Sequence, residues 1–119
     1  MVQPATPLPA QSGPAIDRDH LRQMTLGDAA LEREVLQLFD RQAALLIERM
    51  RSADAKALSA LAHALKGSAR GIGAWQVAEA VGVVERGDEA AGGYDAALNA
   101  LAAAVAVARA AIARILAAG

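Results

Sequence analysis

The chain has 119 residues, of which 55% are hydrophobic and 21% are charged, and its formal net charge at pH 7 is -1. This length fits one domain with a substantial core and is too short for two domains. The near-zero charge and an aromatic content of 3% argue against DNA or RNA binding. Because the chain has no cysteine and only two histidines, His20 and His63, we expect no disulfide and no metal site, and the composition suits a reducing cytoplasm.

The N-terminal residues 1–15 are predicted to form a disordered tail. They contain all four prolines of the chain, with small and polar residues between them. They lack the basic start and continuous apolar core of a secretory signal, so no export is expected. A single folded domain is predicted over residues 16–119.

The first helix predicted within this domain is short and spans residues 16–24. Asp17 is its expected N-cap, and Leu21 and Met24 are expected to turn inward. We expect His20 to be an exposed surface histidine without a role.

A second helix is predicted to begin at Asp28, whose carboxylate suits the positive end of the helix dipole. Its length is about six turns, and its charged residues indicate a solvated face. The predicted apolar stripe, spaced three and four residues apart, consists of Leu31, Val35, Leu38, Phe39, Gln42, Leu45, Leu46 and Arg49 or Met50.

A third helix is predicted from a cap at Ser52 or Asp54 to about residues 70–73. At about 100° per residue, His63 projects roughly opposite to the apolar stripe and should face water. That stripe consists of Leu58, Leu61, Leu65, Ser68, Ala69 and Ile72. The residues expected on the same side as His63, one or two turns away, are Lys56, Ser59, Lys66, Gly67 and Arg70.

Gly67 is the least expected residue of this helix. A glycine inside a helix costs about 1 kcal/mol relative to alanine, and the chain uses alanine almost everywhere else. A missing β-carbon one turn after His63 would let a partner surface approach the imidazole. The alternative is that Gly67, Gly71 and Gly73 only fray the helix toward its C-terminal end.

Two further helices are predicted after this one. The first spans residues 74–86, with Trp75 packed over a helix junction and Gly82 allowing a close crossing, and residues 87–93 form a loop. The last spans residues 94–117 and is expected to be a bundle helix and not a membrane span. Since no segment alternates with period two, the fold class is all-α: an antiparallel four-helix bundle with a short extra N-terminal helix.

The heptapeptide from His63 to Ala69, HALKGSA, resembles the signature H-x-L-K-G-S-[AS] of the histidine-containing phosphotransfer (HPt) domains of bacterial phosphorelays. Downstream, residues 72–74, Val77 and Glu85 are similar to further positions of that family. Upstream, Leu21, Gly27, Asp28 and Phe39 also stand where the family has such residues. The similarity runs over about residues 17–89, and valine replaces the commoner leucine at Val77 and Val84.

The resemblance implies that His63 accepts a phosphoryl group from the phosphoaspartate of a response-regulator receiver domain and passes it to another receiver. A hybrid sensor kinase would be a further partner, and Mg²⁺ would be bound by the receiver. Lys66 would steady the phosphoryl oxygens, and Gly67 would make room for the docking partner.

Lys56, Ser59 and Arg70 are candidate binding residues, whereas Ser68 and Gly73 are candidate structural residues of the motif. Because the sequence has no phosphate-binding loop for ATP, the chain is expected to be a phosphoryl carrier without a cofactor of its own. We also expect it to be a monomer and to be cytoplasmic.

Three alternatives stay open. A bundle of the same fold could bind a receiver or kinase without ever being phosphorylated. The phosphoacceptor domain of a sensor kinase would have an acidic residue directly after its histidine and a proline soon after, whereas here Ala64 follows and no proline does. A hydrolase with His63 as general base would need a nucleophile and an orienting carboxylate that the sequence does not place nearby.

Overall fold

The computed structural model describes residues 13–87 and 93–118, and within these ranges it contains five helices and no strand. The predicted all-α class is therefore confirmed. Most of the tail predicted to be disordered and most of the predicted loop before the last helix lie outside the described residues. The helices are α2 (Arg18–Met24), α3 (Ala29–Arg51), α4 (Ala55–Ile72), α5 (Trp75–Arg86) and α6 (Gly93–Ala118).

Aspartate side chains begin three of the helices, as the sequence predicts. Asp17 caps α2, Asp28 caps α3 and Asp54 caps α4, and each carboxylate accepts a hydrogen bond from a backbone N–H in the first turn. Gly73 ends α4 at φ +77°, and the N–H of Ala74 donates to the carbonyl of Ala69 across 2.8 Å. The chain therefore turns from α4 into α5 without an intervening loop.

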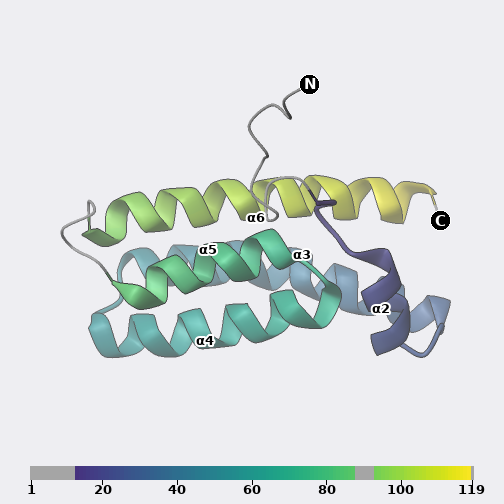
Figure 1. Ribbon diagram of the computed structural model, residues 1–119, viewed down its shortest axis with the longest axis horizontal. Coiled ribbons are helices and arrows are strands. Elements are labelled where there is room, and N and C mark those ends of the chain that lie inside the picture. The colour runs from purple at the N-terminus through teal and green to yellow at the C-terminus, as the bar shows by residue number, and fades with distance from the viewer. Residues whose placement is uncertain (1–12, 88–92, 119) are drawn as a thin grey trace, which may run out of the picture.

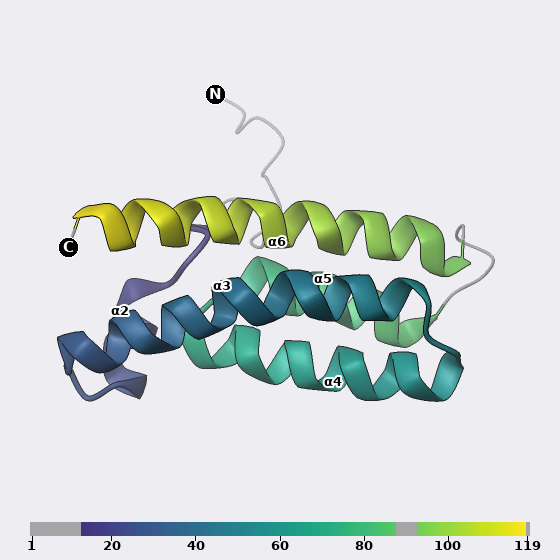
Figure 2. The same ribbon diagram turned by 180° about the vertical axis from the view of Figure 1, so that it is seen from behind.

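The four longer helices enclose one apolar core. Both α3 and α5 contact α4 and α6, while α2 packs against α4. Figures 1 and 2 show α4 and α6 on opposite sides of α3 and α5. The largest fully buried side chains of the core are Leu21, Leu36, Met50, Leu65, Leu101, Ile112, Val77, Val81 and Val84.

The short helix α2 packs against α4 and buries one side chain in the core. Leu21 is fully buried, but Met24 is 57% exposed, so the expectation that both turn inward is wrong for Met24. Met24 instead lines the surface groove between α3 and α4 that is described below. Leu26 and Gly27 follow at positive φ and turn the chain toward α3.

The core face of α3 differs from the predicted stripe. Phe39 and Met50 are buried as expected, whereas Leu31, Leu38 and Leu45 are between 40% and 48% exposed. The apolar residues of α3 cover more than one face of the helix, and the core uses the face between α4 and α6. The residues that fill the core from this helix are Leu36, Phe39, Ala43, Ile47 and Met50.

The helix α6 is long and apolar enough, by length and composition, to cross a membrane. Its mean hydropathy over an 18-residue window is 1.9, and 28% of that window is buried. One such helix is weak evidence, because a core helix of a soluble bundle passes the same test. Here Leu98, Leu101, Val105, Ala108 and Ile112 face the core.

Gly82 in α5 does not mark the close helix crossing that the sequence suggests. A β-carbon placed there would have only the guanidinium of Arg86, on the same helix, as a neighbour, at 3.7 Å. Because Gly82 has no side chain, it leaves open part of the surface groove between α4 and α5 that is described below.

Candidate functional site

His63 lies in the middle of α4 and its side chain is exposed. The helix is fixed from the opposite side, where Leu58, Ala62, Leu65, Ala69 and Ile72 are buried. The rotation of α4 is thus set by the core, and the imidazole is presented to solvent. A neutral imidazole in this position is a competent nucleophile near pH 7.

Three of the residues predicted around His63 lie within one helical turn of it. Ser59 precedes it by four residues, and Lys66 and Gly67 follow by three and four, which are the spacings that bring side chains together on a helix. Lys56 and Arg70 lie two turns away in either direction, and both are exposed.

Gly67 is exposed, and a β-carbon built on it would meet no atom of the protein within 4 Å. The packing of the bundle therefore gives no reason for a glycine at this position. The missing side chain leaves the helix backbone exposed at a point one turn from the imidazole of His63.

Lys66 is held by an acidic residue of the neighbouring helix. Its Nζ donates to Oε1 of Glu85 across 2.8 Å, and the two side chains are 27% and 29% exposed. This ion pair joins α4 to α5. The ammonium group is therefore partly shielded from water and already has a partner when His63 is unmodified.

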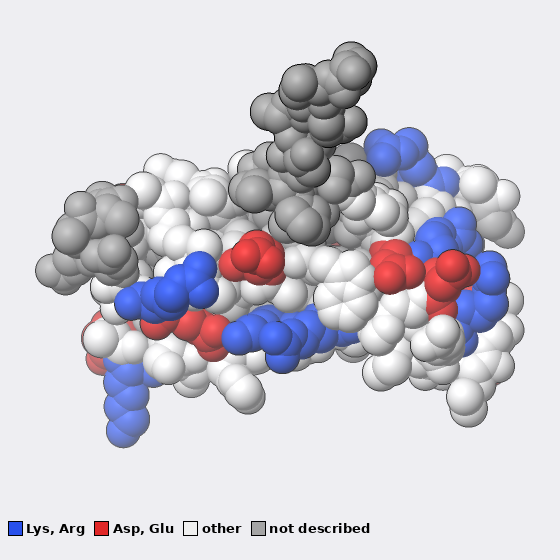
Figure 3. All heavy atoms as spheres, viewed as in Figure 1, with Lys and Arg blue, Asp and Glu red and all other residues white. Residues whose placement is uncertain are grey.

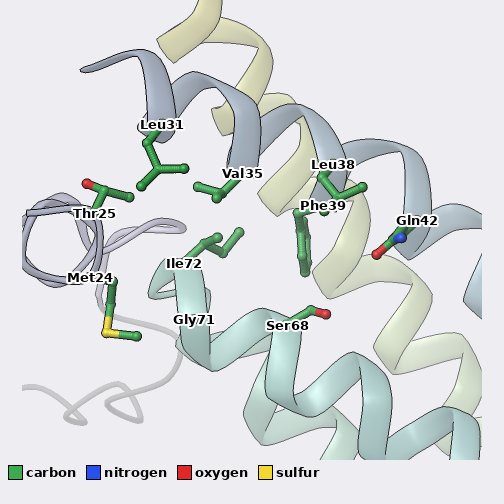
Figure 4. Close-up of a pocket in the computed structure, with 10 residues that line it drawn as sticks. All are labelled: Met24, Thr25, Leu31, Val35, Leu38, Phe39, Gln42, Ser68, Gly71 and Ile72. Carbon is green, nitrogen blue, oxygen red and sulfur yellow. The ribbon is translucent and has the colours of Figure 1, made fainter. Parts of the chain in front are cut away.

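An apolar groove of about 290 Å³ runs between α3 and α4 (Figure 4). Leu31, Val35 and Leu38 reach into it from α3, and Met24 and Thr25 close the end near α2. Ser68, predicted as a structural residue, lines this groove from α4 together with Gly71. Ser68 is half-buried and does not lie beside His63.

On the other side of α4, a polar groove of about 360 Å³ lies against α5. Basic side chains gather along this seam with acidic side chains between them, as the view in Figure 3 shows. The charged residues that line it are Lys66, Arg70, Glu79 and Arg86. The apolar and the charged grooves thus flank α4 on its two sides.

The junction of α2, α4 and α5 is closed by polar contacts. Trp75 donates from Nε1 to Oδ2 of Asp17 across 2.9 Å, which confirms its predicted place over a helix junction. This hydrogen bond, and a second one from the backbone N–H of His20, lower the pKa of the Asp17 carboxyl below its ordinary value. Gly73 is buried beneath Asp17, where a β-carbon would lie 2.8 Å from the aspartate backbone.

His20 is not the free surface histidine that the sequence suggests. Its ring is half-buried and lies with its centroid 4.7 Å from that of Trp75. Nε2 is 2.8 Å from the carbonyl oxygen of Arg70, and since a carbonyl only accepts, His20 donates this bond. The sequence alone does not predict these contacts of His20, because they form only when α2 packs against the end of α4.

Among residues 13–87 and 93–118, no group of three or more histidine, aspartate or glutamate side chains could hold a metal ion. The candidate site consists of an exposed histidine on a bundle helix, with a lysine and an exposed glycine one turn away. Such a site can carry a group that another protein supplies.

Comparison with protein families agrees with this description. The model of the Hpt domain matches residues 20–117, and the chain belongs to this family. No curated protein and no solved structure matches the chain. Hpt domains carry phosphoryl groups in phosphorelays, are not classical enzymes, and interact with response-regulator receiver domains.

No functional role was predicted for Glu85 or His20, and none of the exposed leucines of α3 was singled out as a docking residue. Glu85 stands 19 residues after Lys66, so helical periodicity contains no signal for their pairing. Its place in the family pattern was the one available indication. Hydrophobic spacing found the leucines but assigned them to the core.

Proposed function

We propose that the chain is a histidine phosphotransfer protein of a phosphorelay, in which His63 accepts a phosphoryl group from one receiver domain and gives it to another. The observation that carries the proposal is the exposed imidazole of His63, one turn from Lys66 and from the open backbone at Gly67, in a chain of the Hpt family.

In the forward step, a ring nitrogen of neutral His63 attacks the phosphorus of the receiver's aspartyl phosphate. The N–P bond forms as the P–O bond to the aspartate breaks, and the carboxylate leaves with the electron pair of that bond. The other ring nitrogen keeps its proton. Transfer onward reverses these changes at a second receiver, so no net oxidant or proton source is needed.

The acidic residues and the Mg²⁺ for this displacement would belong to the receiver. Lys66 would interact with the phosphoryl oxygens once they are on His63, and Lys56 and Arg70 would complement the acidic site of the receiver. Ser59, one turn before His63, would lie at the edge of the same contact. A hybrid sensor kinase would supply the donor receiver in a cytoplasmic pathway.

We place the docking face for the receiver on the α3 side of His63. The apolar groove there is lined by the exposed Leu31 and Leu38 of α3 and by Ser68 of α4, which directly follows Gly67 in the chain. Partly exposed apolar side chains next to a bare helix surface favour a protein partner that buries them. The contacts of α3 and α5 with both α4 and α6 support an antiparallel four-helix bundle. We propose that this bundle acts as a monomer.

The test is intact-mass spectrometry after mixing the protein with a panel of phosphorylated receiver domains. We expect one phosphate on the wild type and none on His63→Gln, with the acid lability and base stability of phosphohistidine. His20→Gln is the matched control and should keep the label, because the His20 ring is engaged with Trp75 and the Arg70 carbonyl.

A label that persists in folded His63→Gln would contradict the assignment of the site. If no receiver of a broad panel labels the folded wild type, the chain is instead a bundle that occupies a receiver or kinase surface without transfer.

A further inference from the structure

The ammonium group of Lys66 has two possible anionic partners. In the unmodified protein it pairs with Glu85 on α5, with Nζ and Oε1 2.8 Å apart. After phosphorylation, a phosphoryl group would stand on His63, three residues earlier on the same helix face. Lys66 cannot fully neutralise both anions, so the two compete for it.

The framework around Glu85 is rigid, but the ion pair itself is exchangeable. Val81 and Val84, in the turn that precedes the glutamate, are buried in the core, and α5 packs against α4. The two charged side chains keep more than a quarter of their surface in contact with water, and pairs of this kind are weak. A phosphoryl group carries nearly two charges and three acceptor oxygens, against one charge on a carboxylate.

Glu85 would retain polar neighbours after losing the lysine. A cleft of about 40 Å³ next to it is lined by Ser59 of α4 and Tyr94 of α6. The carboxylate also keeps access to water, as its exposed fraction of 29% requires. Release of Lys66 therefore does not leave a buried charge without a partner.

We propose that Glu85 is a positioning residue that holds Lys66 on α5 while His63 is unmodified and competes for it after phosphorylation. The inference rests on the proposed function. Its consequence is that Glu85 limits how strongly Lys66 stabilises phosphorylated His63, and so keeps the phosphoryl group ready for onward transfer.

The test uses phosphoramidate, a small phosphoryl donor for histidine, so that no receiver is needed. The full chain is labelled, the donor is removed, and the decay of the His63 label is followed by ³¹P NMR, with His63→Gln defining the signal. We expect Glu85→Gln to lengthen the lifetime of phosphorylated His63 by about twofold to fivefold, the range for a partly exposed ion pair. Lys66→Ala should shorten it.

A double variant separates positioning from other effects. If Glu85 acts through Lys66, Glu85→Gln has no effect on the lifetime in the Lys66→Ala background. Glu79→Gln is the matched control, since Glu79 is an exposed glutamate of α5 that lines the groove containing Lys66. It should leave the lifetime unchanged.

A second readout follows the ion pair directly. The ¹³Cδ shift of Glu85 should change when wild-type His63 is phosphorylated and should not change in Lys66→Ala. The proposal is overturned if Glu85→Gln decays like wild type, if its effect survives without Lys66, or if Glu79→Gln matches it. Because phosphoramidate replaces the receiver, a chain that accepts nothing from receivers still gives these lifetimes, and the two failures are distinguishable.

Discussion

Gly67 lies one turn after His63 on the exposed side of α4, and nothing in the bundle occupies the space where its side chain would be. Its cost to the helix is therefore not offset by any internal contact. Replacement by alanine removes that cost, which is about 1 kcal/mol. A residue that lowers stability without a packing reason is best explained by the approach of a partner.

We predict that Gly67→Ala and Gly67→Leu both unfold at higher urea concentration than wild type but transfer phosphate more slowly, with the larger side chain slower. Equilibrium unfolding and transfer from a phosphorylated receiver measure the two effects. Gly82→Ala is the control, because it adds a methyl group to α5 and should leave transfer unchanged. Wild-type transfer by folded Gly67→Leu would refute the access role.

Asp17 joins the start of α2 to Trp75 at the start of α5. The hydrogen bonds from the indole and from the His20 amide stabilise the charged carboxylate, so its pKa is lower in the folded than in the unfolded chain. A group of this kind contributes stability above its unfolded pKa, and this contribution is lost as the pH falls through the folded value.

We predict that Asp17→Asn lowers the free energy of unfolding at pH 7 and weakens its dependence on pH in the acid range below pH 4. Urea denaturation followed by circular dichroism between pH 3 and pH 7 measures both. Asp19→Asn is the matched control, since its carboxylate is 90% exposed on the same helix. Identical pH profiles for Asp17→Asn and wild type would contradict this role of the carboxylate.

At the scale of helices, α3 presents two apolar faces with different uses. One fills the core, and the other carries Leu31 and Leu38, which are 40% and 45% exposed and line the groove beside α4. Polar replacements on such an exposed face usually change stability by less than about 0.5 kcal/mol. The same replacements remove apolar area that a docked partner would bury.

We predict that Leu38→Gln leaves the unfolding midpoint nearly unchanged and weakens receiver binding by about threefold to tenfold, as for a contributing interface residue. Calorimetric titration with a receiver domain measures the affinity. Val107→Gln on α6 is the control, because Val107 is also an exposed apolar residue, at 52%, and lies outside the proposed docking face. Equal affinities for wild type and Leu38→Gln would move the docking face elsewhere.

Local chemistry made the helix ends predictable. Asp17, Asp28 and Asp54 act as caps within three residues of their partners, and Gly73 adopts the left-handed conformation that terminates α4. The rotation of α3 was harder to predict, because hydrophobic spacing does not distinguish a face that meets the core from one that is apolar and exposed. Contacts between distant segments, such as Lys66 with Glu85, leave no local pattern at all.

For the whole molecule, the arrangement of four helices separates two surfaces. The helix α4, which carries His63, and the long helix α6 lie on opposite sides of α3 and α5 (Figure 1). Leu98, Leu101, Val105 and Ile112 of α6 meet the core, while its exposed surface is mostly alanine. This division explains why a bundle helix with one buried face has the composition of a membrane span.

The only tryptophan of the chain lies at the joint of three helices, against His20 and bonded to Asp17. This position makes Trp75 an intrinsic optical probe. Detachment of α2 would remove the carboxylate and the imidazole from the indole together and expose the ring to water, which shifts its emission to longer wavelength. The fluorescence of the unlabelled protein therefore reports whether α2 is packed against the C-terminal end of α4, the helix that carries His63.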